Sequence, residues 1–392
     1  MIQQKFRLTA LLKAEHASGD WTGTETSWAS SKHTSGRFEF AYDYQRADLD
    51  VRGPAFYELN DCDSQTVYAG SGMAAIAALL LASARLIGRA KILVPPGSYG
   101  ETQELVQGYA RQLHLVTDFH EAIGNRENCR ILLLDSSLPA AAFEATVRER
   151  PPQLDLLIFD TTCFVARSGR IGRVVKWAKH HQVPLVMVRS HNKLDSLGAE
   201  YGRLGSAVFI DRHHDFEKSP SKIKGLPSEM RNAVRLLGGA ALPAHFPPYV
   251  GRPTYRELTS RRTAAILRNS RRSSRYFAAK LPCMTRELRY THGLYITLKG
   301  ADTLSEEKAR QTAALLSEDL GGRGLAIRHA GSFGFDFAAT EWFRDRTTDE
   351  YVVRIAIPDL ATVHWDELTH AIAEWWLAHM KAARLRRADL LA

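Results

Sequence analysis

The sequence predicts an α/β fold with an open, mostly parallel sheet, followed by a smaller α+β domain. Short, near-continuous hydrophobic runs recur up to about residue 211, and segments with helical spacing lie between them. Strands of a parallel sheet show such runs because helices bury both faces of the sheet. A Gly/Pro-rich stretch at 239–256 predicts a linker to the second domain.

Each expected element follows from one of these patterns. Strands of the large sheet are predicted at 91–96, 129–135, 154–160, 183–190 and 205–211. The helices between them are predicted at 73–88, 100–112 and 170–182. The second domain begins with a long basic helix, has strands at 294–299 and 350–357, and closes with a helix through 364–380. We therefore expect an N-terminal arm (1–45), a large domain (46–256) and a small domain (257–392).

Composition and charge narrow the class of protein. The 392 residues are 45% hydrophobic and 24% charged, which excludes a mainly disordered chain, a collagen and a disulfide-stapled miniprotein. Four cysteines lie far apart with no CxxC pair, so the sequence predicts reduced thiols and no zinc cluster. The charged N-terminus lacks the apolar core of a signal peptide, and no apolar run approaches a membrane span. We expect a cytoplasmic protein with no membrane contact.

The net charge of +9 comes partly from two arginine clusters. They comprise Arg261, Arg262, Arg268, Arg271, Arg272 and Arg275, then Arg384, Arg386 and Arg387. Such clusters fit a nucleic-acid surface, but apolar residues between the first six favour an ordinary solvated helix face. No zinc-finger, RNP-like or basic-zipper pattern accompanies them. Nucleic-acid binding is therefore the weaker interpretation, below an anionic small molecule or a phosphate cofactor.

Three polar segments lie where an open α/β sheet places its active site, at the C-terminal ends of strands. Asp160 ends one run, Lys193 follows another, and small residues at 70–73 precede a helix. Each alone is typical of a cap, a solvated charge or a tight turn. Together they are the acid, the amine and the phosphate loop that a pyridoxal phosphate site needs.

Four motifs carry a resemblance to fold-type-I pyridoxal phosphate enzymes. They are AGSGMAAI (69–76), SYGET (98–102), DTT (160–162) and SHNK (190–193). They are similar to the phosphate loop, the ring-stacking tyrosine, the pyridinium aspartate and the Schiff-base lysine of that family. The strongest likeness is to the Cys/Met-metabolism branch, which includes the cystathionine synthases and lyases and the methionine γ-lyases. It spans residues 44–360 and implies a seven-stranded-type sheet and pyridoxal 5′-phosphate as the cofactor.

The resemblance also implies roles for individual residues. Lys193 would be the aldimine lysine, Asp160 the partner of the ring nitrogen, and Tyr99 the residue stacked on the ring. Expected at the cofactor phosphate and its surroundings are Ser71, Gly72, Met73, Ser190 and Asn192, with Tyr44 and Arg46 reaching in from a neighbouring subunit. Arg354 and Ser332 would bind the substrate carboxylate. A shared site of this kind implies a homodimer or a homotetramer.

Several positions depart from the family pattern. Asn192 replaces a threonine, Leu138 replaces an asparagine, and Glu101 stands near the stacking tyrosine where the methionine lyases have a cysteine. Residues 194–206 do not keep the family's motif after the lysine either. Glu101 is a candidate contact for a cationic donor, although a carboxylate at a helix start is the plainer interpretation. The departures cluster where substrate side chains would lie, so the resemblance implies an unusual substrate.

The function implied is that of a transferase or lyase acting on an amino acid with a leaving group. The reaction would be γ- or β-elimination or replacement, through an aldimine and a quinonoid, with a second small-molecule substrate in the case of replacement. The altered pocket leaves open a donor such as S-adenosylmethionine and a carbon or sulfur nucleophile. The alternatives are an aminotransferase or β-lyase on the same fold, and a non-catalytic relative that binds nucleic acid.

Overall fold

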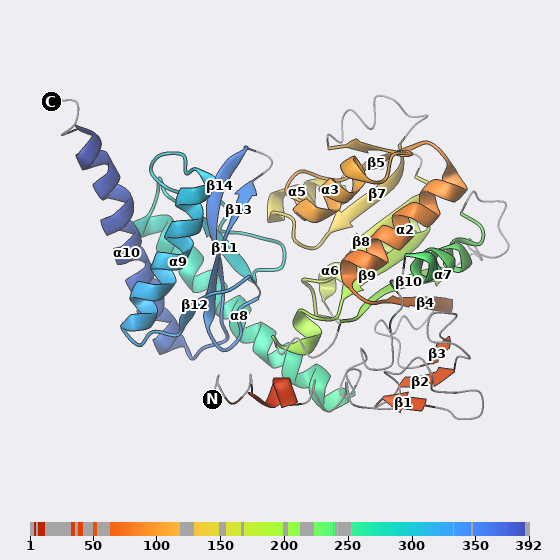
Figure 1. Cartoon of the computed structure of the whole chain (residues 1–392), viewed down its shortest axis with the longest axis horizontal. Helices are drawn as coiled ribbons and strands as arrows, with labels where there is room; N and C mark the ends of the chain where they lie inside the picture. Colours follow the sequence, from red (N-terminus) through yellow and green to blue (C-terminus); the bar gives the residue numbers. More distant parts are fainter. Residues whose placement is uncertain are drawn as a thin grey trace. The chain divides into compact units, whose positions relative to one another are not determined.

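The computed structural model divides the chain into two compact units, Met1–Thr259 and Ser260–Ala392 (Figure 1). The residues it describes are 4, 7–11, 33–35, 38–41, 50–52, 63–117, 129–148, 154–165, 168–198, 203–211, 223–237, 239, 241, 252–331, 333–345 and 348–388. The division falls within helix α8 (Pro253–Lys280). Residues 253–256 of the expected linker are therefore helical, and 242–251 lie outside the described residues.

A seven-stranded sheet forms the centre of the first unit, which confirms the predicted fold class. Its strand order is β4-β10-β9-β8-β7-β5-β6. The strands are β4 (Asp63–Ala69), β5 (Ala90–Leu93), β6 (Leu113–Val116), β7 (Cys129–Asp135), β8 (Leu156–Asp160), β9 (Leu185–Ser190) and β10 (Gly205–Asp211). The neighbours from β9 to β6 pair in parallel, whereas β10 runs antiparallel to both β4 and β9.

Helices bury both faces of this sheet. They are α2 (Gly72–Ile87), α3 (Gly100–Gly108), α5 (Ala140–Arg148), α6 (Gly169–His180) and α7 (Leu226–Leu236). Successive residues of β7 alternate between two core clusters: Ile131 and Leu133 pack with α2 and α7, while Leu132 and Leu134 pack with α5 and α6. This alternation explains the near-continuous hydrophobic runs, since neither side of the strand meets water.

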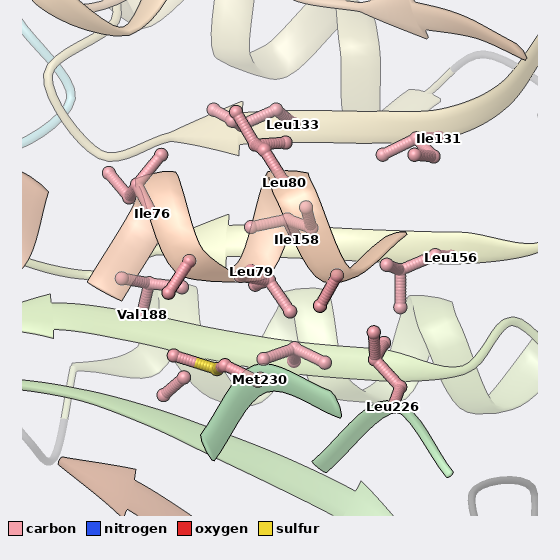
Figure 2. Packing of buried hydrophobic residues seen from close by; sticks show 14 of the residues in the cluster. Ile76, Leu79, Leu80, Ile131, Leu133, Leu156, Ile158, Val188, Leu226 and Met230 are labelled. Carbon is pink, nitrogen blue, oxygen red and sulfur yellow. The ribbon is translucent and has the colours of Figure 1, made fainter. Parts of the chain in front are cut away.

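The core on the α2 side consists of aliphatic side chains from helices and strands that are far apart in sequence. Helix α2 contributes Ile76, Leu79 and Leu80, which lie over Leu133 and Ile158 of the strands (Figure 2). Helix α7 adds Leu226 and Met230 to the same cluster (Figure 2). Because α2 is anchored along its length, the start of this helix is held at a fixed place on the sheet.

The second unit has a four-stranded sheet with the order β11-β14-β13-β12. These strands are β11 (Tyr295–Leu298), β12 (Ile327–His329), β13 (Ala338–Asp345) and β14 (Glu350–Ala356). Helices α8, α9 (Glu306–Gly322) and α10 (Thr362–Ala388) complete the unit. The indole of the buried Trp365 in α10 donates a 2.9 Å hydrogen bond to the Asn269 carbonyl of α8, and this contact ties the two long helices together.

Several elements were not foreseen from the sequence. The two outer strands of the large sheet, β4 and β6, lack a long hydrophobic run, because several of their residues are exposed or only half-buried. Three short strands, β1 (His33–Ser35), β2 (Phe38–Ala41) and β3 (Asp50–Arg52), form a small sheet, and β1 and β2 fall inside the expected arm. In the described part of the chain, no helix combines the length and the apolar character that crossing a bilayer requires.

Candidate functional site

The C-terminal ends of the parallel strands meet at one edge of the large sheet. There β7 ends at Asp135, β8 at Asp160 and β9 at Ser190. Strand β10 runs the opposite way, so its first residue, Gly205, lies at the same edge and pairs with Ser190. The site expected from the sequence therefore forms around the end of β8, with α2 beginning beside it.

Asp160 and Asp135 are neighbours at this edge. They are register partners on β8 and β7, and the period of two directs both side chains to the face that α2 covers. One Asp160 oxygen accepts a 2.8 Å hydrogen bond from the Thr162 N–H. The two Asp135 oxygens accept 2.7 Å bonds from the N–H groups of Ser137 and Tyr99.

Burial dominates the electrostatics of this carboxylate pair. Loss of hydration raises the pKa of Asp160 to about 7, and the nearby Asp135 carboxylate adds to the shift. Burial also raises the pKa of Asp135, against the hydrogen bonds from the backbone of Ser137 and Tyr99. Two acids whose pKa values rise together form a place where a positive charge would be stabilised.

Tyr99 is positioned through its backbone rather than through its ring. It is the residue before α3, and its N–H is fixed on Asp135. The residue is 42% exposed, so the ring is accessible at the edge of the sheet. Glu101 is exposed in the first turn of α3, where a carboxylate is favoured by the helix dipole.

The start of α2 packs closely against the ends of two strands. A β-carbon on Gly72 would lie 2.7 Å from the β-carbon of Ser190, and one on Gly205 would lie 2.1 Å from the carbonyl oxygen of Ser71. Both positions therefore require glycine. Ser71 caps the helix, its hydroxyl accepting a 3.0 Å hydrogen bond from the Ala74 N–H. The N–H groups of Gly72 and Met73 precede the helical ladder and suit an anion.

Lys193 lies in a turn between β9 and a short 3₁₀ helix, Leu194–Ser196. Its side chain is half-buried. The turn is fixed by hydrogen bonds from its neighbours: Asn192 Oδ1 accepts from the Leu204 N–H at 3.1 Å, and Ser196 Oγ donates to the Asn192 carbonyl at 2.8 Å. The Asn192 side chain thus has a local structural partner, and its role towards a cofactor stays a prediction.

Sequence reasoning missed several polar residues around this site. Asp135 ends a hydrophobic run exactly as Asp160 does, so the same signal could have found it. Arg189 is buried inside the run of β9, and a charged residue at such a position requires a partner. Its partner, Asp195, carries no sequence signal of its own.

The two expected substrate residues belong to the second unit, and two of the expected cofactor residues belong to the N-terminal region. Arg354 lies on β14 opposite Glu341 of β13, with which it forms an ion pair. Its guanidinium lies 4.9 Å from the centre of the Tyr295 ring. Ser332, Tyr44 and Arg46 lie outside the described residues. Their expected roles stay predictions, as does the role of Arg354.

Arginines of the first basic cluster form contacts within the second unit. Arg262 pairs with Asp336 and Asp359, and Arg272 pairs with Asp366. The Arg268 guanidinium donates to the Leu360 carbonyl. These contacts favour the interpretation of the cluster as a helix face over that of a nucleic-acid surface.

Comparisons with known proteins find matches to solved structures but none to a family model or a curated protein. The protein called metB from Corynebacterium glutamicum has a TM-score of 0.56 at 14% identity, over 93% of this chain and 97% of that chain. Cystathionine γ-synthase from Xanthomonas oryzae pv. oryzae, in complex with cystathionine, has a TM-score of 0.55 at 16% identity, over 94% and 98%.

A third match is 8-amino-7-oxononanoate synthase from Francisella tularensis, with a TM-score of 0.52 at 12% identity over 79% of this chain and 81% of that chain. All three are fold-type-I pyridoxal phosphate enzymes. The chain therefore has the fold-type-I architecture, as the sequence motifs indicated, at a level of identity that establishes the fold alone.

Proposed function

We propose that this protein binds pyridoxal 5′-phosphate and acts on an amino acid with a leaving group, as a transferase or lyase. The observation that carries the proposal is the buried Asp160 at the end of β8, beside the loop after β9 that contains Lys193. Along the chain the acid of β8 precedes the amine after β9, and both are next to the start of α2, where the close packing at Gly72 and Gly205 requires glycine. This arrangement agrees with the sequence motifs and with the fold.

The residues present fit the cofactor. Its pyridine nitrogen is basic, and the paired carboxyls of Asp160 and Asp135 would stabilise the protonated, cationic form. Phosphate suits the N–H groups of Gly72 and Met73 at the start of α2, with the Ser190 hydroxyl beside them. When bound, the cofactor supplies an electron sink for carbanion chemistry at the substrate Cα.

Three side chains of the protein would then have distinct roles in the reaction. Lys193 Nζ would carry the cofactor covalently and, once released, would take the proton from the substrate Cα and, in γ-chemistry, would remove and later return a proton at Cβ. Asp160, ionised against the ring cation, would hold the proton on the ring nitrogen. The exposed ring of Tyr99 would lie flat against the heterocycle and fix its tilt.

The substrate carboxylate is assigned to Arg354 and Ser332 within this proposal. A guanidinium offers the planar fork that a carboxylate fits, which a lysine does not. Because Glu341 pairs with Arg354, the substrate would compete with a side chain of the protein. Tyr44 and Arg46 would complete the phosphate site from a second copy of the chain, in a homodimer or homotetramer.

The reaction we favour is γ-elimination or γ-replacement. The leaving group could be a thiol, an acyl ester or a sulfonium, the last as in S-adenosylmethionine, with a carbon or sulfur nucleophile in replacement. The support is the Cys/Met-type motif set together with the match over nearly the whole length of cystathionine γ-synthase. A panel of γ-substituted and β-substituted amino acids, each assayed for release of the substituent with and without an added nucleophile, separates the reactions. An aminotransferase keeps the substituent on its oxo-acid product, and a β-lyase releases it only from β-substituted substrates.

The proposal is tested by reducing the purified protein with borohydride after adding pyridoxal phosphate. We expect a phosphopyridoxyl group on the peptide that contains Lys193, found by mass spectrometry. Lys193→Ala should lose it, whereas Lys176→Ala, an exposed lysine of α6, should keep it. A protein that stays colourless and unlabelled, but binds DNA or RNA in a salt-sensitive way, would instead support the non-catalytic alternative.

A further inference from the structure

A buried polar network lies behind the proposed site. Arg189 is the penultimate residue of β9 and only 1% exposed. The residues two and four before it, Met187 and Leu185, belong to the core on the α5/α6 side of the sheet. By the same alternation Arg189 faces that side, opposite to Asp160. A guanidinium at such a place must have partners, because burying an unpaired charge is costly.

The guanidinium joins two loops. Its Nε and Nη2 donate to the two oxygens of Asp195 at 2.6 and 2.7 Å. Its Nη1 donates to the carbonyls of Thr161 and Phe164, both at 2.7 Å. Asp195 lies two residues after Lys193, and Thr161 directly follows Asp160. One side chain thus ties the loop of the proposed amine to the loop of the proposed acid.

His191 extends the network to β10. Its Nδ1 lies 2.7 Å from Asp195 Oδ2, and its Nε2 lies 2.7 Å from Ser206 Oγ. Burial alone would raise the pKa of Asp195, but the Arg189 charge reverses this and lowers it well below its ordinary value. Burial lowers the pKa of His191. An ionised carboxylate only accepts, so a neutral His191 donates from Nδ1 and accepts from the Ser206 hydroxyl at Nε2.

The order Ser206, His191, Asp195 is also that of a serine-hydrolase triad, but burial rules out that use. Ser206 is 0% and His191 1% exposed, so a substrate carbonyl has no access to the hydroxyl. The hydrogen bonds described above connect loops and strands of the first unit. The network therefore serves to hold structure in place.

We propose that Arg189 and Asp195, with His191, are positioning residues that hold the Lys193 loop and the Thr161–Phe164 loop as one rigid body. The two loops are already joined at their bases, where the Ser190 N–H donates to Thr162 Oγ1 at 2.9 Å, and the Arg189–Asp195 pair extends this connection past Lys193. This inference rests on the proposed function for its meaning, since it concerns the residues assigned to the cofactor. A misplacement of about 1 Å in such groups can cost about a hundredfold in rate.

The test compares Asp195→Asn with Met230→Ala, a core substitution in α7 of the same unit. Asp195→Asn keeps the shape of the side chain and removes the charge that Arg189 binds. Hydrogen exchange in the apoprotein reports the order of residues 161–165 and 190–198. The rate at which borohydride fixes added pyridoxal phosphate to Lys193 reports the placement of the amine. Ser206→Ala, which removes one neutral hydrogen bond, serves if Asp195→Asn does not fold.

We expect Asp195→Asn to speed exchange in both segments, and to slow labelling of Lys193, by about tenfold or more. Ser206→Ala should shift both in the same direction, by about twofold or more. Met230→Ala should leave both unchanged after allowance for its loss of melting temperature. Faster exchange in 190–198 alone, or equal changes in the control, would overturn the inference. If the unaltered protein is not labelled at Lys193, the proposed function is refuted instead. Hydrogen exchange would still test whether the network holds the two loops together.

Discussion

Asp135 and Asp160 end neighbouring parallel strands as register partners, with both carboxyls buried on the same face of the sheet. Their environments differ. Asp135 accepts two backbone N–H groups, one of them from Tyr99, whereas Asp160 accepts from Thr162 and has its pKa raised to about 7. Asp135 therefore links Tyr99, the candidate ring-stacking residue, to the strand end that carries Asp160.

The first prediction concerns pH. Folded Asp160 keeps its proton up to about pH 7, whereas in the unfolded chain an aspartate loses it near pH 4. Between these values Asp160 binds more protons in the folded state, so its contribution to the free energy of unfolding of the apoprotein should fall as pH rises from about 4 to 7. The buried His191, whose pKa is lowered, contributes in the opposite direction. Urea unfolding of the unaltered protein and of Asp160→Asn across this range isolates the Asp160 contribution: the variant should lose it and so show a less negative slope, and an unchanged slope would contradict the assignment.

The second prediction concerns the charge of Asp160. Asp160→Asn keeps the size of the side chain but cannot be ionised against a ring cation. We expect pyridoxal phosphate to bind at least about tenfold more weakly, since a hydrogen bond to a charged group contributes about 1.5–3 kcal/mol. Titration by absorbance measures the affinity. Asp302→Asn, at an exposed position of the second unit, is the control and should bind normally.

The third prediction concerns the packing around the start of α2. Gly205→Ala would drive a β-carbon into the Ser71 carbonyl, so we expect a loss of about 1–3 kcal/mol in the free energy of unfolding. Gly172→Ala, in α6 with open space around it, should raise stability by about 0.5–1 kcal/mol. Thermal unfolding of both variants gives the comparison, and equal effects would show that the close approach is not real.

The fourth prediction concerns Arg354 and its partner Glu341. If Arg354 binds the substrate carboxylate, Arg354→Lys should raise KM for the amino acid by about tenfold, because the planar fork is lost. Glu341→Gln should lower KM, because it removes the competing charge. Steady-state kinetics with one amino-acid substrate measures both. A KM that neither substitution moves would mean that the pair is only a cross-strand contact.

The fifth prediction concerns a shared site. Arg46→Ala should weaken retention of the cofactor, and Lys193→Ala should abolish covalent binding. Mixing the two variants creates dimers in which one of the two sites has both residues intact, so activity should partly return. Refolded mixtures of the two variants, assayed against each alone, provide the measurement. No gain on mixing would argue against a contribution from a second subunit.

The strands that are buried on both faces could be predicted from the sequence. β7, β8 and β9 were found because both of their faces are covered, and the same runs located Asp160 and Lys193. Contacts between segments that are distant in the sequence could not be predicted. Arg189 finds Asp195 in the next loop and two carbonyls after β8, and no local pattern encodes such a pairing. The edge strands β4 and β6 were not predicted, because polar and apolar residues are mixed along them.

The alternation of residues along β8 also constrains how the protein can change. Phe159 packs on one helical layer and Ile158 on the other, so inserting a single residue before them would exchange the two layers and rotate the terminal carboxyl away from α2. Only insertions or deletions of paired length would preserve the geometry. The parity of this strand's length is thus as strict a requirement as the acid it presents.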